Sequence, residues 1–256
     1  MRKINIVPNL ITGFGLACGL FVIFKVNLTG EPSYVLLKQM VYILLLAAIA
    51  DLIDGAVARL IHAESQFGIL FDSLADSVSF GVAPSVLLLK ALSLSSYSFF
   101  AFFIIASAMV YTVSGVIRLV RFNVKHAMLG PNDPDKKVFI GLPIPAAMLG
   151  SVSITLLLYA PWIGISARLE PWLLALIMGV INIFLGYLMV SKIRFPSFKQ
   201  FTLRKISFRL LFVTSFLILF CLYGAIYYLP VMLAIVAWGY IGLSLLAAFM
   251  RVFRKR

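Results

Sequence analysis

The chain has 256 residues, of which 62% are hydrophobic and 12% are charged, with a formal net charge of +13 at pH 7. So much apolar surface exceeds what a soluble domain of this size can bury, which excludes a water-soluble globular protein and predicts a membrane protein. The positive charge alone would allow a nucleic-acid partner, but most basic residues lie at the ends of apolar segments or between them, which argues against one.

Eight apolar stretches are long enough to cross a membrane, because a bilayer core of roughly 30 Å takes about 20 residues of helix. In chain order they cover residues 9–28, 34–61, 67–92, 97–121, 141–160, 170–191, 206–227 and 229–250. We therefore predict an all-α, polytopic membrane helix bundle with about eight transmembrane helices. The connections are short except at about 122–140 and 192–205, so residues 1–256 are predicted to form one domain.

The basic residues are distributed unequally between the two sides of this predicted bundle. If the N-terminus is cytoplasmic, four of the 22 lysines and arginines, namely Lys25, Lys38, Lys90 and Arg168, fall on the far side, and all others are cytoplasmic. Such a bias sets the orientation of membrane proteins. We predict a multi-pass protein of the cell (inner, cytoplasmic) membrane with both termini in the cytoplasm, where its basic residues meet anionic lipid headgroups.

The second and third predicted helices each carry a pair of aspartates. Asp51 and Asp54 are three residues apart, and Asp72 and Asp76 are four apart, so each pair lies on one face of its helix. A carboxylate at membrane depth is costly unless it faces a polar cavity and a partner. The connection between the two helices turns at the cytoplasmic surface, so all four carboxylates are expected to converge near that surface.

This aspartate cluster has the composition of a metal site. Four carboxylates in one place repel one another, and divalent cations remove that conflict. Carboxylate oxygens suit hard ions such as Mg²⁺ or Mn²⁺, and a carboxylate between two ions can bridge them. Two ions roughly 3.5–4 Å apart stabilise both the attacking and the leaving oxygen in phosphoryl transfer. The cluster therefore predicts a site for two divalent ions and a phosphate-containing substrate.

Three residues beside the aspartates point to the same chemistry. Gly55 follows the second aspartate, and Gly68 precedes the third by one helical turn, where a missing side chain lets a ligand or a neighbouring helix approach closely. Arg59 lies two turns after Asp51 and can reach a phosphate at the cytoplasmic edge. We expect the aspartates and Arg59 together to hold a diphosphate.

The chain resembles the CDP-alcohol phosphotransferase family in an eight-residue signature. The match covers Asp51, Asp54, Gly55, Ala58, Arg59, Gly68, Asp72 and Asp76, with every gap preserved. That family transfers a phosphatidyl or related group from a CDP-linked donor to an alcohol and releases CMP. The resemblance implies that the four aspartates hold two divalent ions and that Asp76 also acts as general base on the acceptor hydroxyl. It further implies CDP contacts by Gly55, Ala58 and Arg59, a diphosphate contact by Ser65, and a homodimer.

Four longer segments resemble one branch of this family, the bacterial-type CDP-diacylglycerol serine O-phosphatidyltransferases. They are PNLIT (8–12), QFGILFDSLADSVSFGVAP (66–84), RLVRFN (118–123) and FIGLPIPAA (139–147). The resemblance implies that CDP-diacylglycerol is the donor and L-serine the acceptor, and that phosphatidylserine is the product. A donor with an archaeal type of lipid stays open.

Several polar residues in these segments suit the two substrates. Arg118 and Arg121, at the cytoplasmic end of the fourth predicted helix, are the expected ligands of the serine carboxylate, because a guanidinium can bind a carboxylate bidentately. Their alternative role is that of topology anchors. Asn9 and Thr12, at the start of the first helix, are expected either to cap that helix or to contact the donor nucleotide.

Two other functions stay open from the sequence alone. The first keeps the chemistry but changes the acceptor to glycerol 3-phosphate or inositol phosphate, whose dianion would also suit Arg118 and Arg121. The second is a cation or proton-coupled transporter, because intramembrane carboxylates also mark ion pathways. A transporter often has interrupted helices in paired repeats, and no internal repeat stands out in this chain. The enzyme is therefore the favoured interpretation.

Overall fold

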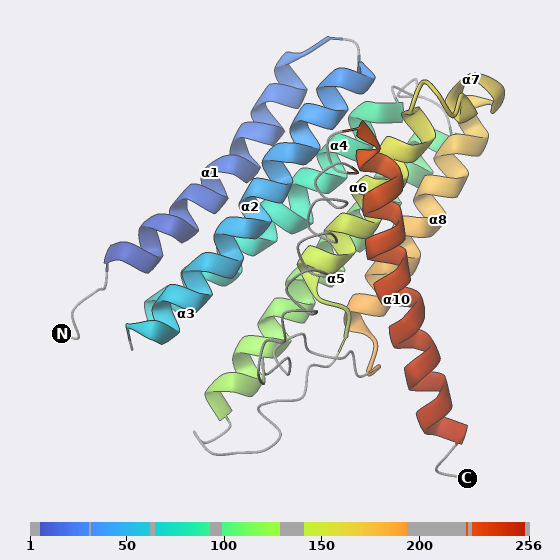
Figure 1. Cartoon of the computed structure of the whole chain (residues 1–256). Helices are drawn as coiled ribbons and strands as arrows, with labels where there is room; N and C mark the ends of the chain where they lie inside the picture. Colours follow the sequence, from blue (N-terminus) through green and yellow to red (C-terminus); the bar gives the residue numbers. More distant parts are fainter. Residues whose placement is uncertain are drawn as a thin grey trace, which may run out of the picture.

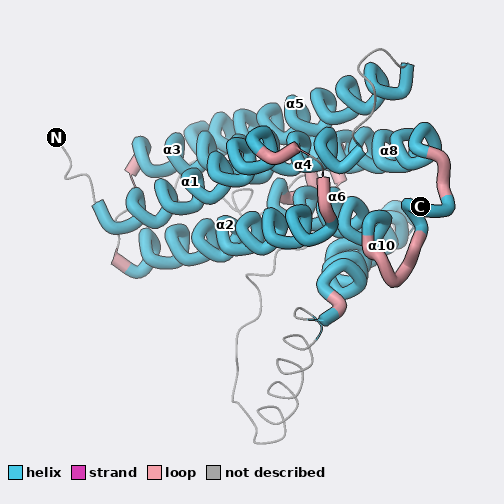
Figure 2. The backbone as a smooth tube through the Cα atoms, turned by 90° about the horizontal axis from the view of Figure 1, so that it is seen from above, coloured by secondary structure: helices cyan, strands magenta, loops and turns pink. Residues whose placement is uncertain are grey.

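The computed structural model describes residues 6–30, 32–61, 65–92, 99–128, 141–193, 224 and 227–253. These residues are almost entirely helical, and none of them forms a strand (Figure 2). The elements are α1 (Ile6–Leu28), α2 (Tyr34–Leu60), α3 (Gln66–Asp76), the π-helix η1 (Ser77–Val82), α4 (Ala83–Leu92), α5 (Phe99–Met128), α6 (Ile144–Tyr159), α7 (Ile165–Arg168), α8 (Pro171–Val190) and α10 (Leu229–Phe253). The predicted all-α class is confirmed.

Six helical segments among the described residues are long and apolar enough to cross a membrane. They are Ile6–Leu28, Tyr34–Ala58, Gln66–Leu92, Phe99–Lys125, Pro171–Val190 and Leu229–Met250. The predicted helix at 141–160 is present as α6, which has 16 residues and is shorter than these six segments. Nearly all of the predicted helix at 206–227 lies outside the described residues, so the count of eight stays a prediction.

The first three spans lie side by side. α1 packs against α2 and also along the continuous rod formed by α3, η1 and α4. α5 packs against α8, and α6 packs against α10 (Figure 1). Figure 1 also shows that α1 begins and α10 ends at the same end of the bundle, which is also where α2 ends and α3 begins. That arrangement agrees with the prediction of two termini on one side, while the side itself stays a prediction.

The core lies between the helices, and many large apolar side chains face outward. Leu37, Leu44, Phe80 and Met148 are almost completely buried and belong to one apolar cluster, which is contributed by α1, α2, η1, α4, α5, α6, α8 and α10. Large side chains such as Phe102 are exposed on the outer surface, as expected where lipid is the solvent. The helices therefore bury their inner faces and leave apolar outer faces for the bilayer.

The third span differs from the single α-helix predicted at 67–92. Six of its residues, Ser77–Val82, form a π-helix that begins directly after Asp76. π-helical turns are rare and usually occur inside longer α-helices, often at functional sites. The span thus changes its winding next to the predicted catalytic aspartate.

Candidate functional site

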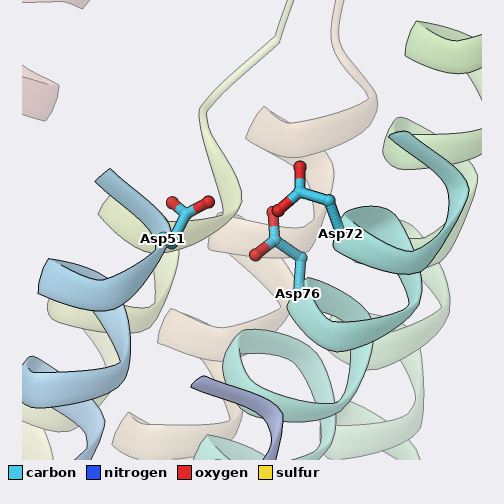
Figure 3. Close-up of side chains that lie close together, drawn as sticks. All are labelled: Asp51, Asp72 and Asp76. Atoms are coloured by element: carbon cyan, nitrogen blue, oxygen red, sulfur yellow. The ribbon is translucent and has the colours of Figure 1, made fainter. Parts of the chain in front are cut away.

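Three of the predicted metal ligands meet between α2 and α3. Asp51, Asp72 and Asp76 each offer a carboxylate oxygen, and these oxygens lie within 4.8 Å of one another. Asp51 projects from α2, while Asp72 and Asp76 project from successive turns of α3 toward it (Figure 3). The spacing of four residues puts the last two on one helix face, as predicted. All three side chains are partly buried, so they lie neither in bulk solvent nor in the closed core.

Asp54 lies one helical turn beyond Asp51 and is more deeply buried, with 4% of its surface exposed. The hydroxyl of Thr12, on α1, donates a hydrogen bond to Oδ2 of Asp54 at 2.6 Å. The same hydroxyl is 3.1 Å from the carbonyl oxygen of Pro8. Thr12, on a third helix, thereby fixes one oxygen of Asp54. The two residues are 42 positions apart, so no local sequence pattern predicts this contact.

All four predicted aspartates line one small cavity. Its lining includes Asp51, Asp54, Asp72 and Asp76, together with Thr12 and Ser79 from α1 and η1. The sequence-based prediction that two carboxylate pairs on separate helices converge is therefore confirmed. The cavity lies where α1, α2 and α3 approach one another.

The donor set of this cavity fits divalent cations. Several carboxylate oxygens within 4.8 Å of one another form an all-oxygen, anionic ligand set, which is what Mg²⁺ and Mn²⁺ prefer. Without cations the cluster would concentrate several negative charges in a partly buried place, at a high electrostatic cost. The residues present could therefore hold the metal ions that the sequence predicts.

Some of the predicted CDP contacts gather at the start of α3. Ser65 is the N-cap of α3, and its hydroxyl oxygen accepts a hydrogen bond from the backbone N–H of Gly68 at 3.0 Å. A Cβ atom placed on Gly68 would lie 3.1 Å from the Ser65 hydroxyl oxygen and 3.4 Å from Oδ1 of Asn9. Asn9 on α1 and Ser65 therefore meet at a position that tolerates little beyond glycine.

The remaining predicted CDP contacts lie on the last turns of α2. Gly55 and Ala58 follow Asp54 on this helix and are half-buried. Arg59 is also on α2, but its side chain lies outside the part that the structure describes. The direct contact of these residues with a nucleotide stays a prediction.

The two arginines predicted to bind the serine carboxylate have different surroundings. Arg118 is buried, with 8% of its surface exposed, and it lies close enough to Asp76 for their charges to interact. Its Nε has no hydrogen-bond partner among the described residues. Arg121 instead donates from Nη1 to the carbonyl oxygen of Val190 at 2.8 Å and from Nη2 to that of Met189 at 3.4 Å. Arg118 thus interacts through its charge with Asp76, whereas Arg121 contacts the C-terminal end of α8.

Other residues that support the site were not singled out from the sequence. Asn123 on α5 donates from Nδ2 to the hydroxyl oxygen of Ser73 on α3 at 2.9 Å, one residue after Asp72. Ser79 on η1 donates to the carbonyl oxygen of Gly15 on α1 at 3.0 Å. The only sequence signal for these contacts is that small polar residues recur in helices that are otherwise apolar.

Comparison with protein families and with curated proteins gives a consistent result. The model of the family described as CDP-alcohol phosphatidyltransferase matches residues 5–188. A Helicobacter pylori (strain ATCC 700392 / 26695) protein named CDP-diacylglycerol–serine O-phosphatidyltransferase is 35% identical over 249 residues, covering 92% of this chain and 96% of that protein.

Two further proteins of the same name come from other lineages. The Bacillus subtilis (strain 168) protein is 36% identical over 196 residues, which cover 77% of this chain and 93% of that protein. The Methanocaldococcus jannaschii protein is 30% identical over 198 residues, which cover 77% of each chain. The similarity therefore extends well beyond the aspartate signature.

Proposed function

The chain belongs to the CDP-alcohol phosphatidyltransferase family, and from this premise we propose that it transfers the phosphatidyl group of CDP-diacylglycerol to the hydroxyl of L-serine. The products are phosphatidylserine and CMP. The observation that carries the proposal is the convergence of Asp51, Asp54, Asp72 and Asp76 on one cavity in a chain whose relatives bear the name of this activity over most of its length.

The four aspartates are the proposed ligands of two divalent ions, Mg²⁺ or Mn²⁺. When bound, such ions neutralise a diphosphate and stabilise the charge that develops on its oxygens during transfer. The role of Thr12 is to hold Asp54 from the side of α1, through the hydrogen bond of 2.6 Å. The ligand set is thereby supported by three helices, which limits its movement during the reaction.

The donor is proposed to lie with its diphosphate at the aspartates and its acyl chains in lipid beside the bundle. Asn9 and Ser65, together with Gly55, Ala58 and Arg59, are the residues proposed to hold the CDP moiety. The meeting of Asn9 and Ser65 at Gly68 supports this assignment, because two polar side chains face a position without a side chain of its own. The missing side chain at Gly68 lets these two polar groups lie close to the start of α3, where they are proposed to face the nucleotide.

Asp76 is proposed as the general base. Its carboxylate accepts the proton of the serine hydroxyl while that oxygen attacks the phosphorus on the lipid side of the diphosphate. The bond between this phosphorus and the bridging oxygen then breaks, and CMP leaves with the bonding electrons. Arg118, whose charge interacts with that of Asp76, is in a position to bind the carboxylate of serine beside the base. Arg121 is proposed to attract the serine carboxylate with its own positive charge, although its described hydrogen bonds are to carbonyl oxygens of α8.

We propose serine rather than another acceptor because of the names of the relatives. Proteins named as serine O-phosphatidyltransferases cover most of this chain in both bacterial and archaeal organisms. None of the relatives named above supports glycerol 3-phosphate or inositol phosphate as the acceptor. The buried guanidinium of Arg118 also suits the negative charge of the serine carboxylate.

The proposal also includes the setting of the reaction. We infer that the active site faces the cytoplasm, because the end of the bundle where α2 meets α3 is the end that the distribution of basic residues assigns to that side. The protein is proposed to act in the cell membrane as a homodimer. Crosslinking in native membranes would test the dimer, and protease accessibility of tagged termini would test the orientation.

The experiment that tests the function is a competition assay on the purified protein with Mn²⁺ or Mg²⁺. CDP-diacylglycerol is supplied together with L-serine, glycerol 3-phosphate and inositol phosphate, and a parallel sample contains a CDP-linked archaeal lipid. The expected result is CMP and phosphatidylserine in equal amounts, and no transfer after removal of the divalent ions. Transfer only to another alcohol would contradict the acceptor, and a lack of CMP release with every alcohol would contradict the chemistry and favour the transporter.

A further inference from the structure

The π-helix η1 has an identifiable cause in the sequence. The backbone N–H of Ala83 donates to the carbonyl oxygen of Val78, five residues earlier, instead of to the carbonyl four residues earlier. In a continuous α-helix the carbonyl of Phe80 would accept from the N–H of residue 84. That residue is Pro84, which has no N–H and whose ring would collide with this carbonyl. The wider π-turn makes room for the proline ring, and the carbonyl of Phe80 does not receive the N–H bond that residue 84 would give it in a continuous α-helix.

Tyr111 supplies that donor from a different helix. Its side chain on α5 is 0% exposed, and its hydroxyl donates to the carbonyl oxygen of Phe80 at 3.0 Å. The next carbonyl, that of Gly81, accepts from the hydroxyls of Ser85 at 3.0 Å and Thr112 at 3.1 Å. Because a buried carbonyl without a partner is costly, the hydroxyl of Tyr111 stabilises η1 at the carbonyl that Pro84 cannot serve, and Ser85 and Thr112 add donors at the next carbonyl.

The opposite side of η1 is held by α1. Ser79 donates to the carbonyl oxygen of Gly15 at 3.0 Å. A Cβ atom on Gly19 would lie 2.7 Å from the Cα atom of Ser79, so the two backbones touch at a place where only glycine fits. η1 is thus clamped between α1 and α5.

These contacts of η1 with α1 and α5 affect the direction in which Asp72 and Asp76 point. A π-turn holds about one residue more than an α-turn, so the helix before it is rotated by about 100° relative to a continuous α-helix. Asp72 and Asp76 precede η1, whereas Ala83 and Leu87, which follow it, are buried in the core. With the α4 side anchored by its packing, the winding of η1 determines whether the carboxylates face Asp51 or turn away from it.

We propose that Tyr111 is a positioning residue for the phosphoryl-transfer site: its hydroxyl replaces the N–H that Pro84 lacks, and it thereby maintains the π-turn that aims Asp72 and Asp76 at Asp51. This inference rests on the proposed function for the reaction that it serves, but its geometry concerns the metal ligands alone. The hydroxyl acts through the backbone of η1 and touches neither substrate nor ion.

The first test compares Tyr111→Phe with the wild-type protein in detergent, using Mn²⁺ as the probe. The expected result is about 10-fold weaker Mn²⁺ binding, measured by electron paramagnetic resonance, which is the lower end of the loss seen when a direct partner of a metal ligand is removed, because Tyr111 acts on the ligands through the backbone of η1. Turnover number falls with it, while the KM for CDP-diacylglycerol changes less. Tyr159→Phe, at the end of α6, is the matched control and is expected to bind Mn²⁺ as the wild type does.

The second test separates positioning from simple stability. The double variant Tyr111→Phe with Pro84→Ala regains an N–H that can bond the carbonyl of Phe80, now in an α-helical register. Its melting temperature is expected to recover, while Mn²⁺ binding and turnover stay low. Recovery of all three would overturn the inference, as would wild-type Mn²⁺ binding by Tyr111→Phe.

The double variant also decides the matter if Tyr111→Phe alone does not fold. In that case a folded double variant with normal Mn²⁺ binding would overturn the inference, and one with weak binding would support it. The outcome is independent of the proposed reaction. If the wild-type protein transferred no phosphatidyl group, the proposed function would fail, whereas the Mn²⁺ comparison would still test the role of Tyr111.

Discussion

The helices around the carboxylate cluster and the helices α6 and α8 use their polar residues differently. Near the cluster, three hydroxyl groups bond a neighbouring helix: Thr12 bonds Asp54, Ser79 bonds Gly15, and Tyr111 bonds Phe80. Other hydroxyls there, such as those of Ser73 and Ser77, bond carbonyls of their own helix. In α6 and α8, most polar side chains instead bond carbonyls of their own helix.

Ser153 donates to the carbonyl of Gly150, Thr155 to that of Ser151, and Asn182 to that of Met178. The hydroxyl of Ser151 is an exception, because it bonds across from α6 to Asn182 of α8 at 2.9 Å. A hydroxyl that bonds its own helix leaves the rotation of that helix free to follow apolar packing. A hydroxyl that bonds a neighbouring helix restricts that rotation, as precise placement of the aspartates requires. Polar residues near the cluster therefore restrict the rotation of the helices that carry the aspartates, whereas most of those in α6 and α8 do not restrict helix rotation.

The largest expected effect comes from Asp76→Asn. The amide keeps the shape of the side chain but cannot accept the serine proton, so turnover should fall by about 10²- to 10⁴-fold. Binding of CDP-diacylglycerol should largely persist, which equilibrium binding to the purified variant measures. Glu170→Gln, at the N-cap of α8, removes a carboxylate from the other region and should leave turnover unchanged. Normal turnover by Asp76→Asn would defeat the assignment of the base.

Thr12→Val should have the next largest effect. Valine has nearly the same shape but loses the hydroxyl that bonds Asp54, so the Mn²⁺ concentration needed for half-maximal turnover should rise by about 10- to 100-fold. Thr12→Ser keeps a hydroxyl and should remain close to the wild type. A rise in the KM for CDP-diacylglycerol without a change in Mn²⁺ dependence would instead favour the nucleotide contact predicted from the sequence.

Gly19→Ala tests the close approach of α1 to η1. The added methyl group would lie 2.7 Å from the Cα atom of Ser79, and overpacking of this kind costs about 1–3 kcal/mol. The measurement is the midpoint of thermal unfolding in detergent. Gly239→Ala on α10 is the control, because among the described residues no atom outside its own helix lies within 4 Å of its Cβ position. Equal stability of the two variants would show that α1 can move away from η1 without loss.

The smallest effect is expected from Ser151→Ala in the second region. The variant loses one hydrogen bond between α6 and α8, and such bonds in membrane proteins average about 0.6 kcal/mol. Thermal unfolding should shift slightly, and turnover should stay the same. A clear loss of turnover would show that this region also positions the aspartates and would remove the contrast between the regions.

Much of the site was predictable because its signals are local. The intervals of three and four residues place each aspartate pair on one helix face, and the short connection between the two helices makes them neighbours. The polar partners of these residues were not predictable in the same way. Thr12 and Asp54 are 42 residues apart, and the amphipathic pattern of α1 is too weak to show which neighbour the threonine faces. The hydrogen bond from Arg121 to the carbonyl oxygen of Val190 likewise depends on how α5 and α8 pack, which the sequence does not show.

The amino-acid sequence by itself determined the membrane setting, the helical class and the residues of the carboxylate cluster, because hydropathy and helical spacing depend only on neighbours along the chain. The tertiary structure decided which hydroxyl holds which partner, and it separated the surroundings of Arg118 from those of Arg121. It also showed that the span with Asp72 and Asp76 contains a π-helix. Pro84 marks the point where an α-helical bond is impossible, but only the packing of α5 shows that Tyr111 replaces it.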